Sequence, residues 1–276
     1  MKKSLFPVLV LALLVACKSS TKQSTKDSTT TPLEVAPKID IENIKSKIQG
    51  TWVKKAYIDK VIETKSPLAA VDEASDLTTF VINTDDIKGD SLKVLAGWGN
   101  HDGSELTLKF KAGKQPSSII FGAGELGLSS VNGANILTYY RLDEKSKKTI
   151  ATQYIKALSQ KPNELGEGTY YLVNKGLIAG DYTMTDSLGV ISKINFDPHG
   201  KVSSFLGYKT YNINIDLNSD VMDNLDEIGF DSFSKDPKSY SFKIDADTLK
   251  LYDTRPNADS TELVLDKLKY RLVRVR

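Results

Sequence analysis

Short runs in which apolar and polar residues alternate constrain the fold of this chain more than any other feature of its sequence. In the clearest run, residues 105–112, Leu106, Leu108 and Phe110 share one face, and the residues between them are polar or charged. Alternation with a period of two is typical of an antiparallel strand that has one buried face and one face in water. We therefore predict an all-β body.

Comparable runs recur at short spacing, with turn sequences such as His101-Asp102-Gly103 between them. The other predicted strands are residues 77–83, 91–97, 118–122, 136–142 and 149–155, then a strand that begins at Tyr170, and residues 190–196, 202–206, 208–217, 240–244, 248–252 and 263–275. Residues 159–168 interrupt the series with proline and glycine. We place a domain boundary there and predict two small antiparallel up-and-down barrels in tandem, residues 39–160 and 168–276, because closing into a barrel hides the edge strands.

The residues before the first barrel have a different composition. Residues 18–38 are mainly Ser, Thr and Lys and contain few large apolar side chains, so we predict a flexible, disordered tether over residues 17–38. Asp40 is placed to cap a short helix in which Ile41, Ile44 and Ile48 share one face, and Gly50 is placed to end it. We expect this helix to pack on the barrel like a lid.

The N-terminus begins with Lys2 and Lys3, followed by an apolar run over residues 5–16. This run is short for a membrane span and ends in small residues, which is typical of a secretory signal peptide over residues 1–16. Residues 14–17, Leu-Val-Ala-Cys, resemble a bacterial lipobox. The resemblance implies that Cys17 becomes the acylated first residue of a lipoprotein, which the acyl chains anchor in a membrane of the bacterial envelope, with the outer membrane as our expectation.

A second resemblance rests on Gly50-Thr51-Trp52 and on Arg274, near the end of the last predicted strand. They are similar to the lipocalin-like family, in which Gly-x-Trp opens the first strand and a late arginine packs over the tryptophan, a cation-π contact. The second half carries Gly180-Asp181-Tyr182 in the corresponding place. The strand that ends near Lys156 in the first half has no arginine to pair with Trp52, and the natural partner of Arg274 is Tyr182. Either there are two lipocalin-like barrels with degraded signatures, or one large barrel closes Trp52 against Arg274. We favour two barrels, because a single lipocalin barrel is usually smaller than this body.

The lipocalin resemblance implies a function in binding a small apolar or amphipathic ligand inside a barrel. The candidate residues for the barrel interior, its closure or ligand contact are Trp52, Trp98, Phe110, Tyr182, Tyr211 and Arg274. The alternative is a non-enzymatic accessory lipoprotein that binds another envelope protein or a glycan through its longest predicted loops, residues 60–75 and 218–235. An enclosed cavity favours the first function, whereas a filled barrel with an exposed aromatic patch favours the second.

Residue types that carry catalysis are sparse in this chain. Cys17 is the only cysteine, and the two histidines, His101 and His199, lie in glycine-containing turns with no serine triad traceable around them. We therefore predict that the protein is not an enzyme and has no cofactor. A formal net charge of +2 also argues against nucleic acid as a partner.

One acidic segment has part of a calcium-loop spacing: Asp216, Asn218 and Asp220, with Glu227 at the twelfth position. Val221 stands where such a loop requires glycine, and a predicted strand rather than a helix precedes the segment. The sequence thus favours a solvated acidic loop over a metal site.

Overall fold

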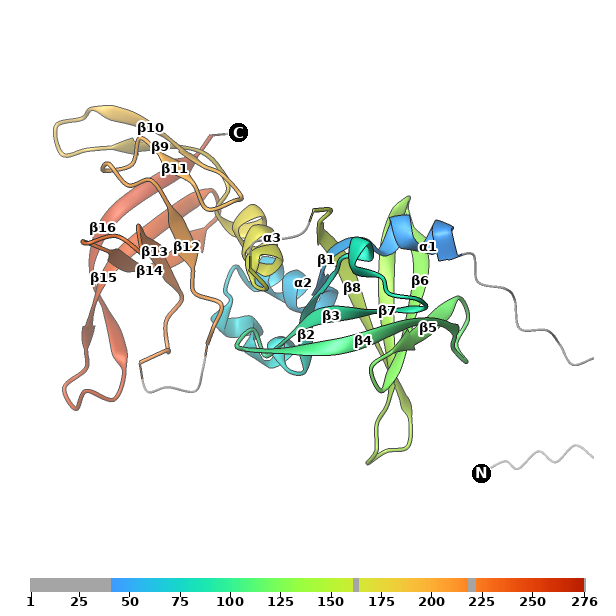
Figure 1. The fold of residues 1–276 in the computed structure, drawn as a ribbon. Coiled ribbons are helices and arrows are strands. Elements are labelled where there is room, and N and C mark those ends of the chain that lie inside the picture. The colour runs from blue at the N-terminus through green and yellow to red at the C-terminus, as the bar shows by residue number, and fades with distance from the viewer. Residues whose placement is uncertain (1–40, 161–163, 218–221, 276) are drawn as a thin grey trace, which may run out of the picture. The chain divides into compact units, whose positions relative to one another are not determined.

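The structure is a computed structural model that describes residues 41–160, 164–217 and 222–275 (Figure 1). All of these residues belong to one compact unit, Ala36–Arg276. The signal peptide, Cys17, the tether and Asp40 lie outside the described residues. Within the described ranges we find no helix that is long and apolar enough to cross a membrane.

The first half is a closed antiparallel barrel in which each strand pairs with the next and the last returns to the first. Its strands are β1 (Gly50–Lys54), β2 (Leu77–Ile82), β3 (Ser91–Trp98), β4 (Asp102–Ala112), β5 (Ser118–Phe121), β6 (Gly124–Val131), β7 (Ala134–Leu142) and β8 (Thr149–Leu158). Helix α1 (Ile41–Ile48) precedes β1, as the sequence predicts, and the short 3-10 helix η2 (Thr84–Asp86) follows β2. The all-β body and its first barrel are therefore confirmed.

The second half is a sheet that does not close between its named strands. Its strand order is β11-β10-β9-β16-β15-β14-β13-β12. The strands are β9 (Gly180–Thr185), β10 (Ile191–Phe196), β11 (Val202–Ser203), β12 (Tyr211–Ile213), β13 (Glu227–Phe230), β14 (Lys238–Asp245), β15 (Thr248–Pro256) and β16 (Leu263–Arg274). A second closed barrel is not confirmed. The two edge strands, β11 and β12, are also shorter than the strands predicted at 202–206 and 208–217.

The physical reason for the short edges lies in the turn between β11 and β12. Ser204, Leu206 and Gly207 all have positive φ angles, which interrupt an extended strand. One isolated bridge between Lys201 and Thr210 nevertheless spans the two edges. It is flanked by a hydrogen bond from the Val202 amide to the Lys209 carbonyl, 2.9 Å long.

Two helices correct the sequence prediction. The predicted strand from Tyr170 is helix α3 (Glu167–Leu177), because Tyr170, Val173 and Leu177 recur at the spacing of a helix face. Helix α2 (Lys55–Thr64) and the 3-10 helix η1 (Leu68–Ala74) occupy most of the predicted loop 60–75. This segment is therefore not an open binding loop.

The two halves share a hydrophobic core through these helices. Tyr57, Ile58 and Val61 of α2 are buried and pack in the same cluster as the core of the second sheet. The Leu68 amide of η1 also donates a hydrogen bond of 2.9 Å to the Asp226 carboxylate, just before β13. The helical insertion of the first barrel thus forms part of the core of the second sheet (Figure 1).

Candidate functional site

Trp52 closes one end of the first barrel, where helix α1 meets β1. Gly50, the first residue of β1, has a φ of +119°, a conformation that L side chains rarely adopt. The Trp52 indole is fully buried, and its Nε1 donates a hydrogen bond of 2.7 Å to the Ile48 carbonyl at the end of α1. The tryptophan therefore satisfies a terminal helix carbonyl and fixes the helix on the barrel.

Lys156 of β8 packs over Trp52, in the place where the lipocalin resemblance implies an arginine. Its Nζ lies 5.0 Å from the centre of the Trp52 ring and donates a hydrogen bond of 2.8 Å to the Lys47 carbonyl. Burial lowers the pKa of the Lys156 amine. The sequence analysis missed this contact because it looked only for arginine.

Arg274 makes the corresponding contact in the second half, with Tyr182. The guanidinium carbon lies 5.1 Å from the centre of the Tyr182 ring. Its nitrogens donate hydrogen bonds to the Leu177 carbonyl, the Ala179 carbonyl and the Tyr182 hydroxyl. The structure therefore has a separate cation-π contact in each half, and Arg274 lies over Tyr182 rather than over Trp52.

The interior of the first barrel is occupied by its own aromatic side chains. The Phe80 ring centre lies 4.8 Å from that of Tyr154 and 5.3 Å from that of Phe121. Phe110 packs in this cluster, while Trp98 is half-buried beside it and donates its Nε1 to the Ser104 hydroxyl. Phe110 and Trp98 thus pack in and against the core, as a small barrel filled by side chains requires.

Tyr211, the remaining candidate, is buried in the core that the two halves share. Its ring packs edge-on against Phe196, with centres 5.1 Å apart, and its hydroxyl donates to the Asp197 carbonyl. Tyr211 also lines a surface pocket that we call the aromatic pocket, with a volume of about 330 Å³. The pocket is lined by Glu164, Glu167, Tyr170, Tyr171, Asn174, Pro198, His199, Gly200, Thr210, Tyr211, Asn212, Ser232 and Phe233.

Helix α3, the β10–β11 turn and the segments around β12 and β13 supply the walls of the aromatic pocket. The Tyr171 ring contacts the His199 ring, with centres 4.8 Å apart, and Lys175 Nζ lies 5.6 Å from the Tyr171 ring. The side chain of Phe233 is fully exposed. An exposed phenyl ring beside two packed rings is an apolar surface that a ligand covers favourably.

Asn174 supplies an unpaired polar atom at this pocket. The residue is only 2% exposed, and its Nδ2 donates a hydrogen bond of 3.3 Å to the Pro198 carbonyl. That bond leaves Oδ1 as the acceptor, and Oδ1 is buried with no partner in the part of the chain that the structure describes. A buried acceptor without a donor costs free energy, which a ligand that carries a donor relieves.

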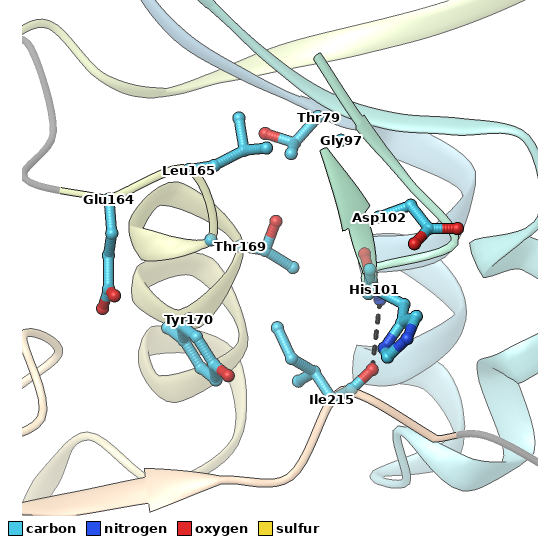
Figure 2. Close-up of a pocket in the computed structure, with 11 residues that line it drawn as sticks. Thr79, Gly97, His101, Asp102, Glu164, Leu165, Thr169, Tyr170 and Ile215 are labelled. Atoms are coloured by element: carbon cyan, nitrogen blue, oxygen red, sulfur yellow. Dashed lines mark hydrogen bonds between the residues drawn. The ribbon is translucent and has the colours of Figure 1, made fainter. Parts of the chain in front are cut away.

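A second pocket adjoins the first, and we call it the polar pocket (Figure 2). Its volume is about 280 Å³, and it shares Glu164 and Tyr170 with the aromatic pocket. Its lining residues are Thr79, Gly97, Asn100, His101, Asp102, Glu164, Leu165, Gly166, Thr169, Tyr170 and Ile215. The β3–β4 turn, the start of α3 and the segment after β12 thus meet around it.

Two contacts join the β3–β4 turn to the segment after β12 at this pocket. His101 Nδ1 lies 2.9 Å from the Asp216 carboxylate, and Asn100 Nδ2 donates to the Ile215 carbonyl over 3.4 Å. The Asp216 carboxylate raises the pKa of the His101 imidazole. Both side chains of the ion pair are about half exposed, so solvent weakens it.

Thr169 projects from α3 toward the space between the helix and the His101 turn (Figure 2). The residue is 1% exposed, and its hydroxyl has no hydrogen-bond partner among the described residues. Each pocket therefore has one deeply buried side chain with an unpaired polar atom.

The partial calcium-loop spacing over residues 216–227 receives no support as a metal site from the described residues. Asp216 faces His101, Asn218 and Asp220 lie outside the described residues, and burial raises the pKa of Glu227, which favours its protonated form. Among the described residues, no group of three or more His, Cys, Asp or Glu side chains is placed to hold a metal ion.

Comparison with known proteins adds no further assignment. No family model, curated protein or solved structure matches the chain.

Proposed function

We propose that this protein is a non-enzymatic, lipid-anchored binding protein of the bacterial envelope, which takes a small amphipathic ligand at the aromatic pocket. The anchor is Cys17, on the lipobox-like sequence Leu-Val-Ala-Cys. We also propose that the second sheet works as a second lipocalin-like barrel, with the Lys201–Thr210 bridge as its closure.

The observation that carries this proposal is the exposed Phe233 ring at a pocket whose wall contains the unpaired Asn174 Oδ1. An apolar face together with a few fixed polar groups is the usual chemistry of a small-molecule site. Packed rings fill the first barrel instead, which argues against the ligand position implied by the lipocalin resemblance. The ligand therefore belongs at the surface, on the segments that surround α3.

Native mass spectrometry of the full chain, extracted gently from its own membranes, tests this proposal. We expect a stoichiometric small-molecule adduct, in addition to the acyl chains, on the wild type. Phe233→Ala removes the exposed ring, so we expect it to lose the adduct. Leu188→Ala is the matched control, because Leu188 is 87% exposed but does not line the pocket.

Two results would contradict the pocket assignment. An adduct that survives Phe233→Ala but is lost in Phe110→Leu would place the ligand inside the barrel. A bare wild-type chain that co-purifies with another polypeptide would instead support the alternative function, an accessory lipoprotein whose partner covers Phe233.

The anchor has its own test. Cys17→Ser removes the thiol that receives the first acyl chains, so we expect loss of radiolabelled palmitate incorporation and accumulation of the unprocessed precursor. Palmitate labelling that persists in the variant would disprove lipidation at Cys17.

A further inference from the structure

We propose that the aromatic pocket and the polar pocket form one continuous site for a linear organic cation, a di- or polyamine. This inference rests on the proposed function, since it names the chemical class of the small molecule that the aromatic pocket takes.

Charge is the first argument. Asp102 lines the polar pocket, Glu167 lines the aromatic pocket, and Glu164 lines both. None of the described lining residues is Lys or Arg, although the whole chain has 37 basic and 35 acidic residues. A site with several carboxylates and no permanently cationic lining residue disfavours anions and attracts cations.

The rings supply the second argument. An ammonium group is attracted to the face of an aromatic ring, and proteins bind quaternary ammonium ligands through aromatic side chains in this way. Lys175 and His199 already lie against Tyr171. Tyr211 is buried and packs against Phe196. Phe233, which is fully exposed, and Tyr170, which lines both pockets, are therefore the rings that we assign to a ligand cation.

The unpaired atoms make the third argument. Asn174 Oδ1 at the aromatic pocket and Thr169 Oγ1 at the polar pocket are both buried, and neither has a partner within the described ranges. Each is on a residue that is at least nine-tenths buried. A protonated amine has only donors, which are what the Asn174 oxygen needs.

The wall that the two pockets share favours an elongated ligand. Because Glu164 and Tyr170 belong to both pockets, a flexible methylene chain that passes between them places one ammonium group in each. A monoamine fills only one pocket. Affinity should therefore rise with chain length and with the number of amino groups.

Isothermal titration of the full chain in lipid nanodiscs with spermidine, putrescine and propylamine tests this inference. We expect spermidine to bind in a 1:1 ratio and at least about tenfold more tightly than propylamine. Glu164→Gln should weaken spermidine binding by about tenfold or more. Thr169→Val should weaken spermidine binding while leaving propylamine binding unchanged.

Glu144→Gln is the matched control, because Glu144 is exposed and lines neither pocket. If Glu144→Gln weakens spermidine binding as much as Glu164→Gln does, the binding is non-specific attraction to acidic surface. That result would overturn the inference. Equal affinities for spermidine and propylamine would also overturn it.

The test separates this inference from the proposed function. If native mass spectrometry finds a Phe233-dependent adduct but spermidine does not bind, the amine assignment is wrong and the aromatic pocket is still the binding site. If neither is found, both proposals fail.

Discussion

At the scale of single residues, Arg274 carries an unusual number of contacts for a half-buried side chain. Its guanidinium pairs with two carbonyls at the end of α3 and with the Tyr182 hydroxyl, and it lies over the Tyr182 ring. The same chemistry recurs at Lys156 and Trp52 in the first half. These two cations fix a helix to the strand that follows it in each half.

Arg274→Met should lower the free energy of unfolding by about 2–4 kcal/mol, because it leaves two carbonyls and one hydroxyl without their donor. Urea unfolding measures the change. Arg271→Met is the control, since Arg271 is on the same strand but exposed, and it should change stability by less than about 0.5 kcal/mol. Equal losses in the two variants would show that the closure contributes nothing specific.

Two buried threonines make a second residue-scale prediction. Thr51 Oγ1 has no hydrogen-bond partner in the described part of the chain, whereas Thr79 Oγ1 donates to the Trp52 carbonyl over 3.0 Å. Thr51→Val should therefore raise the free energy of unfolding by about 1 kcal/mol, and Thr79→Val should lower it by about as much. Urea unfolding of both variants checks the opposite signs, and a shared sign would contradict this interpretation.

At the scale of elements, the contact of α3 with the first barrel depends on a missing side chain. A Cβ added at Gly168 would lie 2.5 Å from Thr51 Cγ2 and 3.2 Å from Ala157 Cβ. These are contacts with β1 and β8, the two strands that close the barrel. The helix therefore sits against the closing strands at a distance that only glycine permits.

Gly168→Ala should lower the free energy of unfolding by about 1–3 kcal/mol through this clash, although alanine favours a helix more than glycine does. A double-mutant cycle with Thr51→Ser, which removes Cγ2, isolates the cause. The loss should be smaller in the Thr51→Ser background. A loss that is the same in both backgrounds would mean that Gly168 matters for another reason.

The strands were easier to predict than the helices, and the reasons are local. Alternation revealed seven of the first barrel's strands or their openings, but β6 has two glycines and several serines and gave no clear pattern. Helix α2 follows β1 directly, and Lys54 provides no side-chain cap to mark its start. Without a cap or a break, the sequence showed no boundary between strand and helix.

The candidate site was harder to predict because its parts are distant in the chain. The sequence analysis singled out the loop that contains Phe233, and it included Tyr211 among the candidates. It took His199 as a turn residue and assigned Tyr171 to a strand. Only the fold brings these residues to one pocket, so periodicity and spacing give no signal for it.

At the scale of the whole molecule, the barrel and the second sheet are held together by a shared core and by a few polar contacts. The core joins α2 to α3 and to the second sheet. Outside that core, the His101–Asp216 pair joins the β3–β4 turn to the segment after β12. This pair contains a histidine, whose charge changes in the physiological pH range.

The pH dependence has a definite sign. Asp216 raises the pKa of His101, with a smaller contribution from Asp102, so the folded chain holds this proton more tightly than the unfolded chain. The stabilisation is fully present below the ordinary histidine pKa of about 6.5 and is lost as pH rises through the raised value.

His101→Gln should therefore lower the thermal midpoint at pH 5.5 and change it little at pH 8.5. The effect should shrink in high salt, because both side chains are about half exposed. Thermal unfolding at the two pH values measures it. A variant that loses as much stability at pH 8.5 as at pH 5.5 would show that the charge on His101 is irrelevant.

Helix α2 also sets a constraint on how the protein is made. The helix comes from the early part of the chain, yet Tyr57, Ile58 and Val61 are covered together with residues as late as Leu272. During synthesis, this apolar face emerges long before the last strand does. We expect the nascent chain to need a holding chaperone during that interval, even though every strand of its first barrel has already been synthesised.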